Sequence, residues 1–150
     1  MSAALNLPDP AATEAFGASL APFVRVGDVI TLSGPLGAGK TSVARGLLAA
    51  LGLAGDAPSP SFAIVQPYNS PEVRLPVLHV DLYRVERTDE LEELGLDDAG
   101  DTLLLVEWPE RAGAGWWPDA LALTLTIRED GARGLTARVP GAWKDRWSPT

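Results

Sequence analysis

The stretch Gly34-Pro35-Leu36-Gly37-Ala38-Gly39-Lys40-Thr41 decides the fold that we expect for this chain. It matches the phosphate-binding loop (P-loop) pattern G-x-x-x-x-G-K-[ST] at every fixed position. Glycines let the backbone wrap around phosphates with its N–H groups pointing inward, and the following helix adds its positive N-terminal end. We expect Lys40 to reach the β- and γ-phosphates and the Thr41 hydroxyl to ligate Mg²⁺. The motif therefore predicts a nucleoside triphosphate site, with ATP as the ligand. The alternative is a glycine-rich turn that matches by chance.

The residues on both sides of the loop have the context that the motif requires. Residues 29–33 (VITLS) predict a buried strand, and residues 41–51 (TSVARGLLAAL) predict a helix that ends at Gly52. Nearer the N-terminus, Asp9 or Thr13 is a candidate cap for a helix with apolar residues at helical spacing.

The rest of the chain predicts further strands around the same sheet. The all-apolar run at 103–106 is typical of a strand that is buried on both faces. The other expected elements are strands at 62–65 and 77–83, a turn at 67–71, an acidic helix at 88–96, and a hairpin of strands 121–127 and 135–139. We therefore predict an α/β fold: a single P-loop NTPase domain spanning residues 1–150, with a mixed, mostly parallel central sheet flanked by helices and a C-terminal antiparallel hairpin.

Composition and charge limit the classes of function that we expect for the chain. The chain has 150 residues, no cysteine and a net charge of −8. No apolar run approaches the ~20 residues of a membrane span, and the start of the chain does not resemble a signal peptide, so we expect a cytoplasmic protein. Lys40 and Lys144 are the only lysines, and the ten arginines form no cluster. Because nucleic-acid binding usually needs a basic surface, we expect no tight, direct binding of RNA or DNA, and any link to nucleic acid to run through a partner protein.

Two predicted strands end in an acid. Glu107 follows the run at 103–106, and Asp81 closes the strand that contains His79. A carboxylate at the carboxyl end of a strand lies at the sheet edge where ligands bind, and a P-loop needs such an acid to complete its Mg²⁺ site. One division of roles places Glu107 on the metal and Asp81 on the attacking water or the water shell of the metal. The alternative is that both acids merely begin solvated loops.

The sequence allows two roles, structural or functional, for several other residues. His79, the only histidine, is expected to be a packed residue with a supporting role near Asp81. Trp108 either packs or touches nucleotide. Trp143 and Trp147 either cap the core or form a patch for a partner.

Four segments together resemble the bacterial TsaE (YjeE) family of P-loop ATPases. They are residues 36–42 (LGAGKTS), 59–62 (SPSF), 79–84 (HVDLYR) and 106–110 (VEWPE), in the family's order and with similar spacing. The resemblance implies a cytoplasmic, Mg²⁺-dependent ATPase of tRNA threonylcarbamoyladenosine (t6A) biosynthesis. It also implies two partner proteins, TsaD and TsaB, which modify the adenosine next to the anticodon, while the ATPase drives or resets their complex.

The resemblance also implies roles for individual residues. Lys40, Asp81 and Glu107 would be needed for catalysis, and Thr41 and Glu107 would hold the metal. Nucleotide contacts would come from Leu36, Gly37, Ala38, Gly39, Lys40, Thr41, Ser42, Glu110 and Arg133.

Three rival functions share the P-loop. A small-molecule kinase would need an acceptor pocket and usually an arginine-bearing lid, and no compact arginine-rich segment is visible. A regulatory GTPase would need a guanine-binding N-K-x-D loop, whereas neither Asn6 nor Asn69 precedes a lysine. A module that binds nucleotide without turnover would not depend on Asp81 and Glu107.

Overall fold

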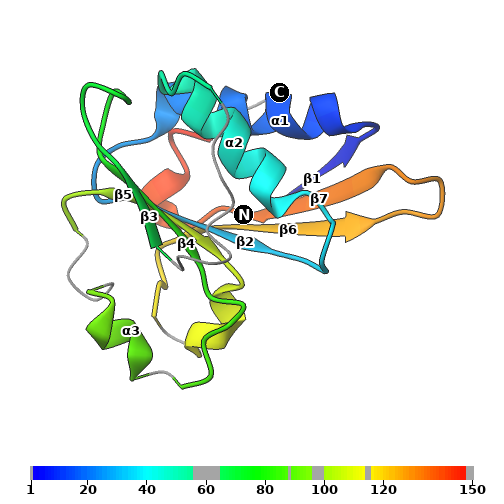
Figure 1. Ribbon diagram of the computed structural model, residues 1–150. Helices are drawn as coiled ribbons and strands as arrows, with labels where there is room; N and C mark the ends of the chain where they lie inside the picture. The colour runs from blue at the N-terminus through cyan, green and yellow to red at the C-terminus, as the bar shows by residue number, and fades with distance from the viewer. Residues whose placement is uncertain (1, 56–64, 88, 96–99, 114–115, 148–150) are drawn as a thin grey trace.

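A mixed sheet of seven strands organises the chain in the computed structural model, which describes residues 2–55, 65–87, 89–95, 100–113 and 116–147 (Figure 1). In chain order the strands are β1 (Ser2–Leu7), β2 (Val29–Ser33), β3 (Val65–Tyr68), β4 (Val77–Asp81), β5 (Leu103–Glu107), β6 (Leu121–Ile127) and β7 (Arg133–Arg138). Their order across the sheet is β1-β7-β6-β2-β5-β4-β3. The four central strands, β6, β2, β5 and β4, are parallel, and antiparallel pairs complete both edges. The predicted α/β class is confirmed, with the parallel part confined to the centre of the sheet.

Helices cover the two faces of the sheet unequally (Figure 1). Helices α1 (Pro10–Ser19) and α2 (Lys40–Ala50) lie together on one face, where the larger hydrophobic core forms against β2, β5, β6 and β7. A smaller core lies on the other face under α3 (Glu90–Glu93) and the 3₁₀ helix η3 (Pro109–Ala112). Two further 3₁₀ helices, η1 (Ala21–Phe23) and η4 (Gly141–Trp143), complete the described elements. None of the described helices is long and apolar enough to cross a membrane.

Most predicted elements occur where the sequence places them. The strands predicted at 29–33 and 103–106, the helix predicted at 41–51 and the hairpin are confirmed to within one or two residues. Asp9 is the N-cap of α1, because its Oδ1 accepts a hydrogen bond from the Ala12 N–H at 2.8 Å.

The differences from the prediction lie at the edges of the sheet. Strand β1 was not predicted, and it exists because it pairs with β7 along its whole length. The turn predicted at 67–71 was wrong at its start, since Pro67 lies within β3, an edge strand that tolerates a residue without an N–H. Strand β4 ends at Asp81 and not at residue 83, and α3 is shorter than predicted. Predictions for residues 56–64, 88 and 96–99 fall outside the described residues.

The C-terminal segment is part of the core. Trp143 is only 1% exposed, and Trp147 packs against Phe16. The Arg146 guanidinium donates to both carboxylate oxygens of Asp28, at 2.6 and 2.8 Å, and lies 4.2 Å from the centre of the Trp143 ring. Of the two interpretations of these tryptophans, the structure selects the core.

Two glycines allow α1 and α2 to touch through their backbones. A Cβ atom at Gly17 would lie 2.0 Å from the Val43 carbonyl oxygen, and one at Gly46 would lie 2.0 Å from the Glu14 carbonyl oxygen. Any larger side chain at either position must therefore push the helices apart.

We predict that Gly46→Ala destabilises the protein by about 1–3 kcal/mol, because the added methyl group overpacks the helix contact. Helix propensity alone predicts the opposite, a gain of about 1 kcal/mol. Urea unfolding of Gly46→Ala and of Ala49→Gly, at an exposed position of the same helix, tests this. We expect the control to lose no more than about 1 kcal/mol. A more stable Gly46→Ala variant would contradict the close helix contact.

Candidate active site

The loop between β2 and α2 needs glycine at both of its ends. Gly34 has φ +139°, and a Cβ atom there would lie 2.5 Å from the Leu125 carbonyl oxygen. Gly39 is the N-cap of α2 at φ +107°, and no side chain caps the helix there. The first N–H groups of α2 therefore face the loop without a capping side chain, which is the arrangement that favours an anion.

Lys40 lies folded back onto the loop. Its Nζ donates to the carbonyl oxygens of Gly34 (2.5 Å) and Pro35 (2.9 Å), and it lies 4.1 Å from the centre of the Trp108 ring. Burial lowers the pKa of the Lys40 ammonium, and the nearby carboxylates, Glu107 foremost, oppose that shift. The Lys40 ammonium is thus held at the loop by two carbonyl oxygens and the face of the Trp108 ring. An anionic ligand can replace these groups.

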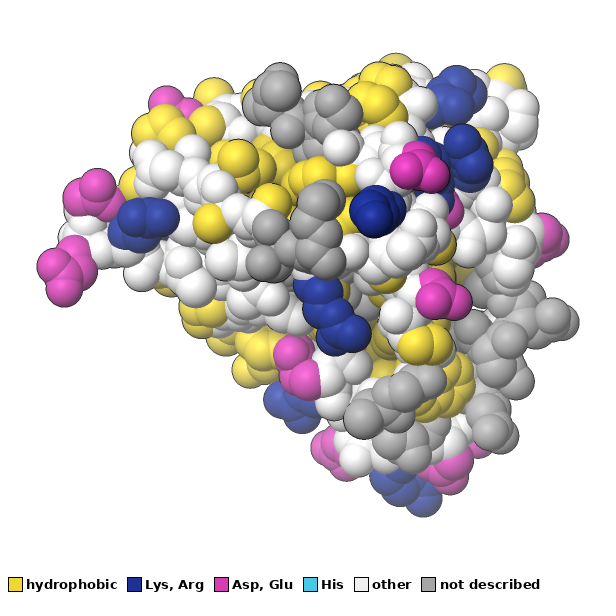
Figure 2. Space-filling model, turned by 180° about the vertical axis from the view of Figure 1, so that it is seen from behind, with side chains coloured by type: hydrophobic (Ala, Val, Ile, Leu, Met, Phe, Trp, Pro, Cys, Tyr) yellow, Lys and Arg dark blue, Asp and Glu magenta, His cyan; other side chains and the backbone are white. Residues whose placement is uncertain are grey.

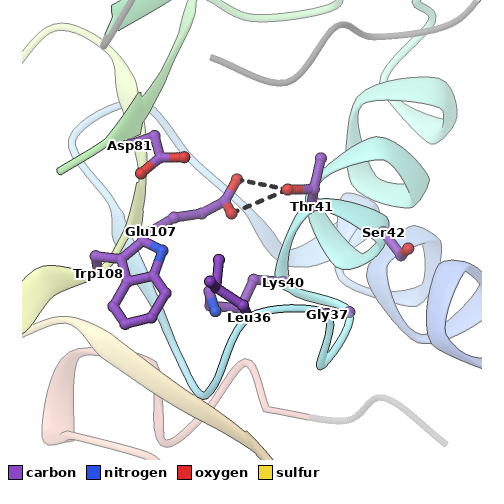
Figure 3. A pocket seen from close by; sticks show the side chains of 9 residues that line it. Leu36, Gly37, Lys40, Thr41, Ser42, Asp81, Glu107 and Trp108 are labelled. Carbon is purple, nitrogen blue, oxygen red and sulfur yellow. Dashed lines mark hydrogen bonds between the residues drawn. The ribbon is translucent and has the colours of Figure 1, made fainter. Parts of the chain in front are cut away.

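The two predicted strand-end acids meet beside the loop. Asp81 and Glu107 are paired neighbours in the register of β4 and β5, and both are buried. The Thr41 hydroxyl lies 3.0 and 3.2 Å from the two carboxylate oxygens of Glu107 (Figure 3). The Oδ1 atom of Asp81 accepts a hydrogen bond from the Tyr83 N–H at 2.9 Å. The structure therefore brings together Lys40, Thr41, Asp81 and Glu107, as the sequence predicted.

Trp108 both packs and lines the site. It is the only described non-glycine residue with a positive φ, +61°, and its N–H donates to the Leu32 carbonyl oxygen. Its ring contacts the smaller core and lies 4.9 Å from the Tyr83 ring. A left-handed backbone is costly for a bulky residue, and such residues concentrate at functional sites. Here the conformation keeps the indole next to Lys40.

Two cavities adjoin at the loop. The first, about 230 Å³, is lined by Leu36, Lys40, Thr41, Asp81, Glu107 and Trp108. The second, about 290 Å³, is lined by Pro8, Asp9, Pro10, Thr13, Gly131 and Arg133. Gly37, Gly39 and Ser42 line both, and the Ser42 side chain lies on the opposite side of the first turn of α2 from Glu107 (Figure 3). Together the cavities have the size of an ordinary ligand pocket of ~300–1,000 Å³.

The second cavity contains residues that the sequence did not single out for function. Thr13 was considered only as a helix cap, yet its methyl group is the atom that a Cβ at Gly39 would meet first, at 3.1 Å. Arg133 was predicted to contact nucleotide, and its Nη2 donates to the Gly37 carbonyl oxygen at 3.1 Å. No local sequence pattern places Thr13 at the loop, because its position depends on the packing of α1 against α2.

Glu110 is placed differently from the other predicted residues. It is exposed and lines a groove with Ser33, Trp116, Trp117 and Arg138, and it lines neither cavity at the loop. Its charge still acts on the site, since it opposes the lowering of the Lys40 pKa. Ala38 is fully buried, so its expected contribution to ligand binding is limited to its backbone.

The oxygen atoms of Thr41 and Glu107 suit a small hard cation. Mg²⁺ is usually held by one or two protein oxygens together with substrate phosphates and water. Within the part of the chain that the structure describes, no group of three His, Asp or Glu side chains forms a complete metal cage. The two oxygen donors of Thr41 and Glu107 therefore fit an ion that arrives with a phosphate ligand.

Comparisons with known proteins identify a family for the chain. The sequence matches the family described as "Threonylcarbamoyl adenosine biosynthesis protein TsaE" over residues 7–136. The tRNA threonylcarbamoyladenosine biosynthesis protein TsaE of Bacillus subtilis is 44% identical over 135 residues, which cover 89% of this chain and 83% of the relative. The protein of the same name from Streptomyces coelicolor is 42% identical over 123 residues, covering 81% and 80%.

The fold is shared with a solved structure. The crystal structure of Bacillus subtilis YdiB superposes with a TM-score of 0.77 at 29% identity, and the match covers 97% of this chain and 90% of the other. The family predicted from the four sequence segments is confirmed. The chain belongs to the TsaE family of threonylcarbamoyl adenosine biosynthesis proteins.

Proposed function

We propose that this chain binds ATP with Mg²⁺ at residues 34–41 and hydrolyses it in support of tRNA threonylcarbamoyl (t6A) modification. The observation that supports this most directly is the contact between Thr41 and Glu107. It joins the P-loop to a strand end 66 residues away, next to a second buried acid, Asp81. Family membership connects this site to tRNA modification.

Each residue of the site has a role in this proposal. The Lys40 ammonium exchanges its two loop carbonyls for phosphate oxygens, which are stronger, charged acceptors. Thr41 and Glu107 hold Mg²⁺, which neutralises charge on the phosphates and aligns them. Asp81, held by the Tyr83 N–H, orients the attacking water or the water shell of the metal.

The two cavities suggest how the nucleotide lies. Phosphates belong in the first cavity, which contains the lysine and both acids. The nucleoside then extends into the second, between Thr13 and Arg133. Glu110 is a proposed nucleotide contact on the family pattern, and it lines the neighbouring groove.

The charge of the molecule favours an indirect route to tRNA. The net charge is −8, and one of the two lysines is buried in the loop. In Figure 2, Lys and Arg side chains are spread over the visible face among Asp and Glu and form no continuous basic surface. We therefore propose that tRNA is reached through TsaD and TsaB, the partners that the family resemblance implies, in the cytoplasm.

A small-molecule kinase is the alternative function that the P-loop allows. It would consume ATP only in the presence of an acceptor, whereas an ATPase releases phosphate without one. Measuring phosphate release with and without candidate acceptors separates the two functions, and acceptor-dependent consumption would favour the kinase. A binding module without turnover would instead keep its function in Asp81→Ala and Glu107→Ala.

We predict that Lys40→Ala lowers the rate of ATP hydrolysis by ~10²–10³-fold, because a cation aimed at the developing phosphate charge is removed. The rate is measured for the chain alone and with TsaD and TsaB present. Lys144→Ala is the matched control, since Lys144 is the other lysine, is exposed and lies in the C-terminal segment. Equal rates for Lys40→Ala and wild type would contradict the proposed site.

We also predict clear binding to a TsaD–TsaB pair, tighter with ATP, and little binding to isolated tRNA. The reason is the net charge of −8, with two lysines and ten scattered arginines in the sequence, because counterion release from nucleic acid needs clustered cations. Pull-down with the purified pair and with tRNA at ~0.15 M salt measures both. Tight binding to free tRNA together with none to the pair would argue against the indirect route.

A further inference from the structure

His79 contacts the candidate metal ligand Glu107. The histidine is 0% exposed on β4, and its Nε2 lies 2.6 Å from Oε2 of Glu107. In the register of the sheet His79 pairs with Leu105, so Glu107 is its diagonal neighbour on the same face as Asp81. The contact therefore links the middle of β4 to the end of β5.

The chemistry of the two groups shows which of them donates the hydrogen bond. A carboxylate only accepts hydrogen bonds, so Nε2 carries the proton and donates to Oε2. The other ring nitrogen, Nδ1, is buried and has no hydrogen-bond partner among the described residues. A buried polar atom without a partner costs stability, and an apolar side chain of similar volume would avoid that cost. The ring is thus poorly suited to packing alone and well suited to holding Glu107.

The hydrogen bond determines which way Glu107 faces. With Oε2 held by His79, Oε1 is directed to the Thr41 hydroxyl, 3.0 Å away, at the edge of the loop cavity. The neighbouring acid has a donor of its own, because the Tyr83 N–H holds Oδ1 of Asp81. Two carboxylates side by side repel each other, and separate donors keep each in its own direction. Without His79 the Glu107 carboxylate is free to turn toward Asp81 or away from Thr41.

We infer that His79 is a positioning residue, which orients the Glu107 carboxylate for Mg²⁺ through its Nε2–H. This role rests on the proposed function of the site. It differs from the supporting role near Asp81 that the sequence suggested, because the hydrogen bond of the imidazole goes to Glu107. Groups that hydrogen-bond a metal ligand typically change metal affinity by about 10–100-fold when they are removed.

The test uses His79→Leu, which removes the donor, and His79→Gln, whose side-chain amide nitrogen supplies an N–H at a reach similar to that of Nε2. Binding of Mn²⁺, as a spectroscopic stand-in for Mg²⁺, is followed by electron paramagnetic resonance with saturating ADP. Calorimetry measures ADP affinity without metal, and thermal unfolding measures stability. We expect His79→Leu to weaken metal binding by about 10–100-fold, with metal-free ADP affinity unchanged. We also expect a lower melting temperature for this variant, because Oε2 of the buried Glu107 loses its donor. We expect His79→Gln to restore metal binding to within about threefold of wild type.

Other outcomes overturn the role. Unchanged metal affinity in His79→Leu would exclude it, and so would equal losses in both variants together with lower melting temperatures, which would indicate packing alone. If His79→Leu does not fold, His79→Asn replaces it, because this shorter amide cannot reach Oε2; full metal affinity in that variant would also exclude the role. Failure of the wild-type chain to bind Mn²⁺ with ADP would instead overturn the proposed function of the site, and the role of His79 with it.

Discussion

The register of β5 between β2 and β4 is the constraint on which the rest of the site depends. Glu107 pairs with Leu32 on one side and with Asp81 on the other, so three strand ends stop at one level of the sheet. The loop that leaves β2 then meets two acids brought from distant parts of the chain. Because side chains alternate along a strand, a shift of one residue would turn Glu107 to the opposite face. The pairing of β5 with β2 on one side and with β4 on the other fixes its register.

Close backbone contacts between neighbouring elements position the residues that line the two cavities. Gly17 and Gly46 let α1 rest directly on α2, and this contact places Thr13 beside Gly39 at the start of the loop. Gly34 lies under the Leu125 carbonyl, which connects the loop to β6 and, through the hairpin, to Arg133. Packing between elements therefore builds the cavity that we propose for the nucleoside. The cavity that we propose for the phosphates combines the P-loop with Asp81 and Glu107 from the ends of β4 and β5.

The site places a buried cation, Lys40, close to two buried acids, Asp81 and Glu107. Lys40 is buried against carbonyl oxygens and an indole ring, and burial lowers its pKa. Asp81 and Glu107 are buried side by side, each held by a hydrogen-bond donor. A phosphate ligand supplies the charge that Lys40 needs, and a divalent cation supplies the charge that the acids need. A nucleotide that arrives with Mg²⁺ satisfies both requirements at once.

The sequence by itself determined the elements whose signals are local: the P-loop with its strand and helix, the buried strand β5, the hairpin of β6 and β7, and the two strand-end acids. It also identified the family, because four short segments carry its pattern. Only the tertiary structure decided that β1 closes one edge of the sheet, that Trp143 belongs to the core and that Glu110 lies in a separate groove. It also decided that His79 contacts Glu107 and that Thr13 lies beside Gly39 of the loop. These features depend on strand pairing and helix packing between residues far apart in the chain, and no local pattern of residue types encodes such distances.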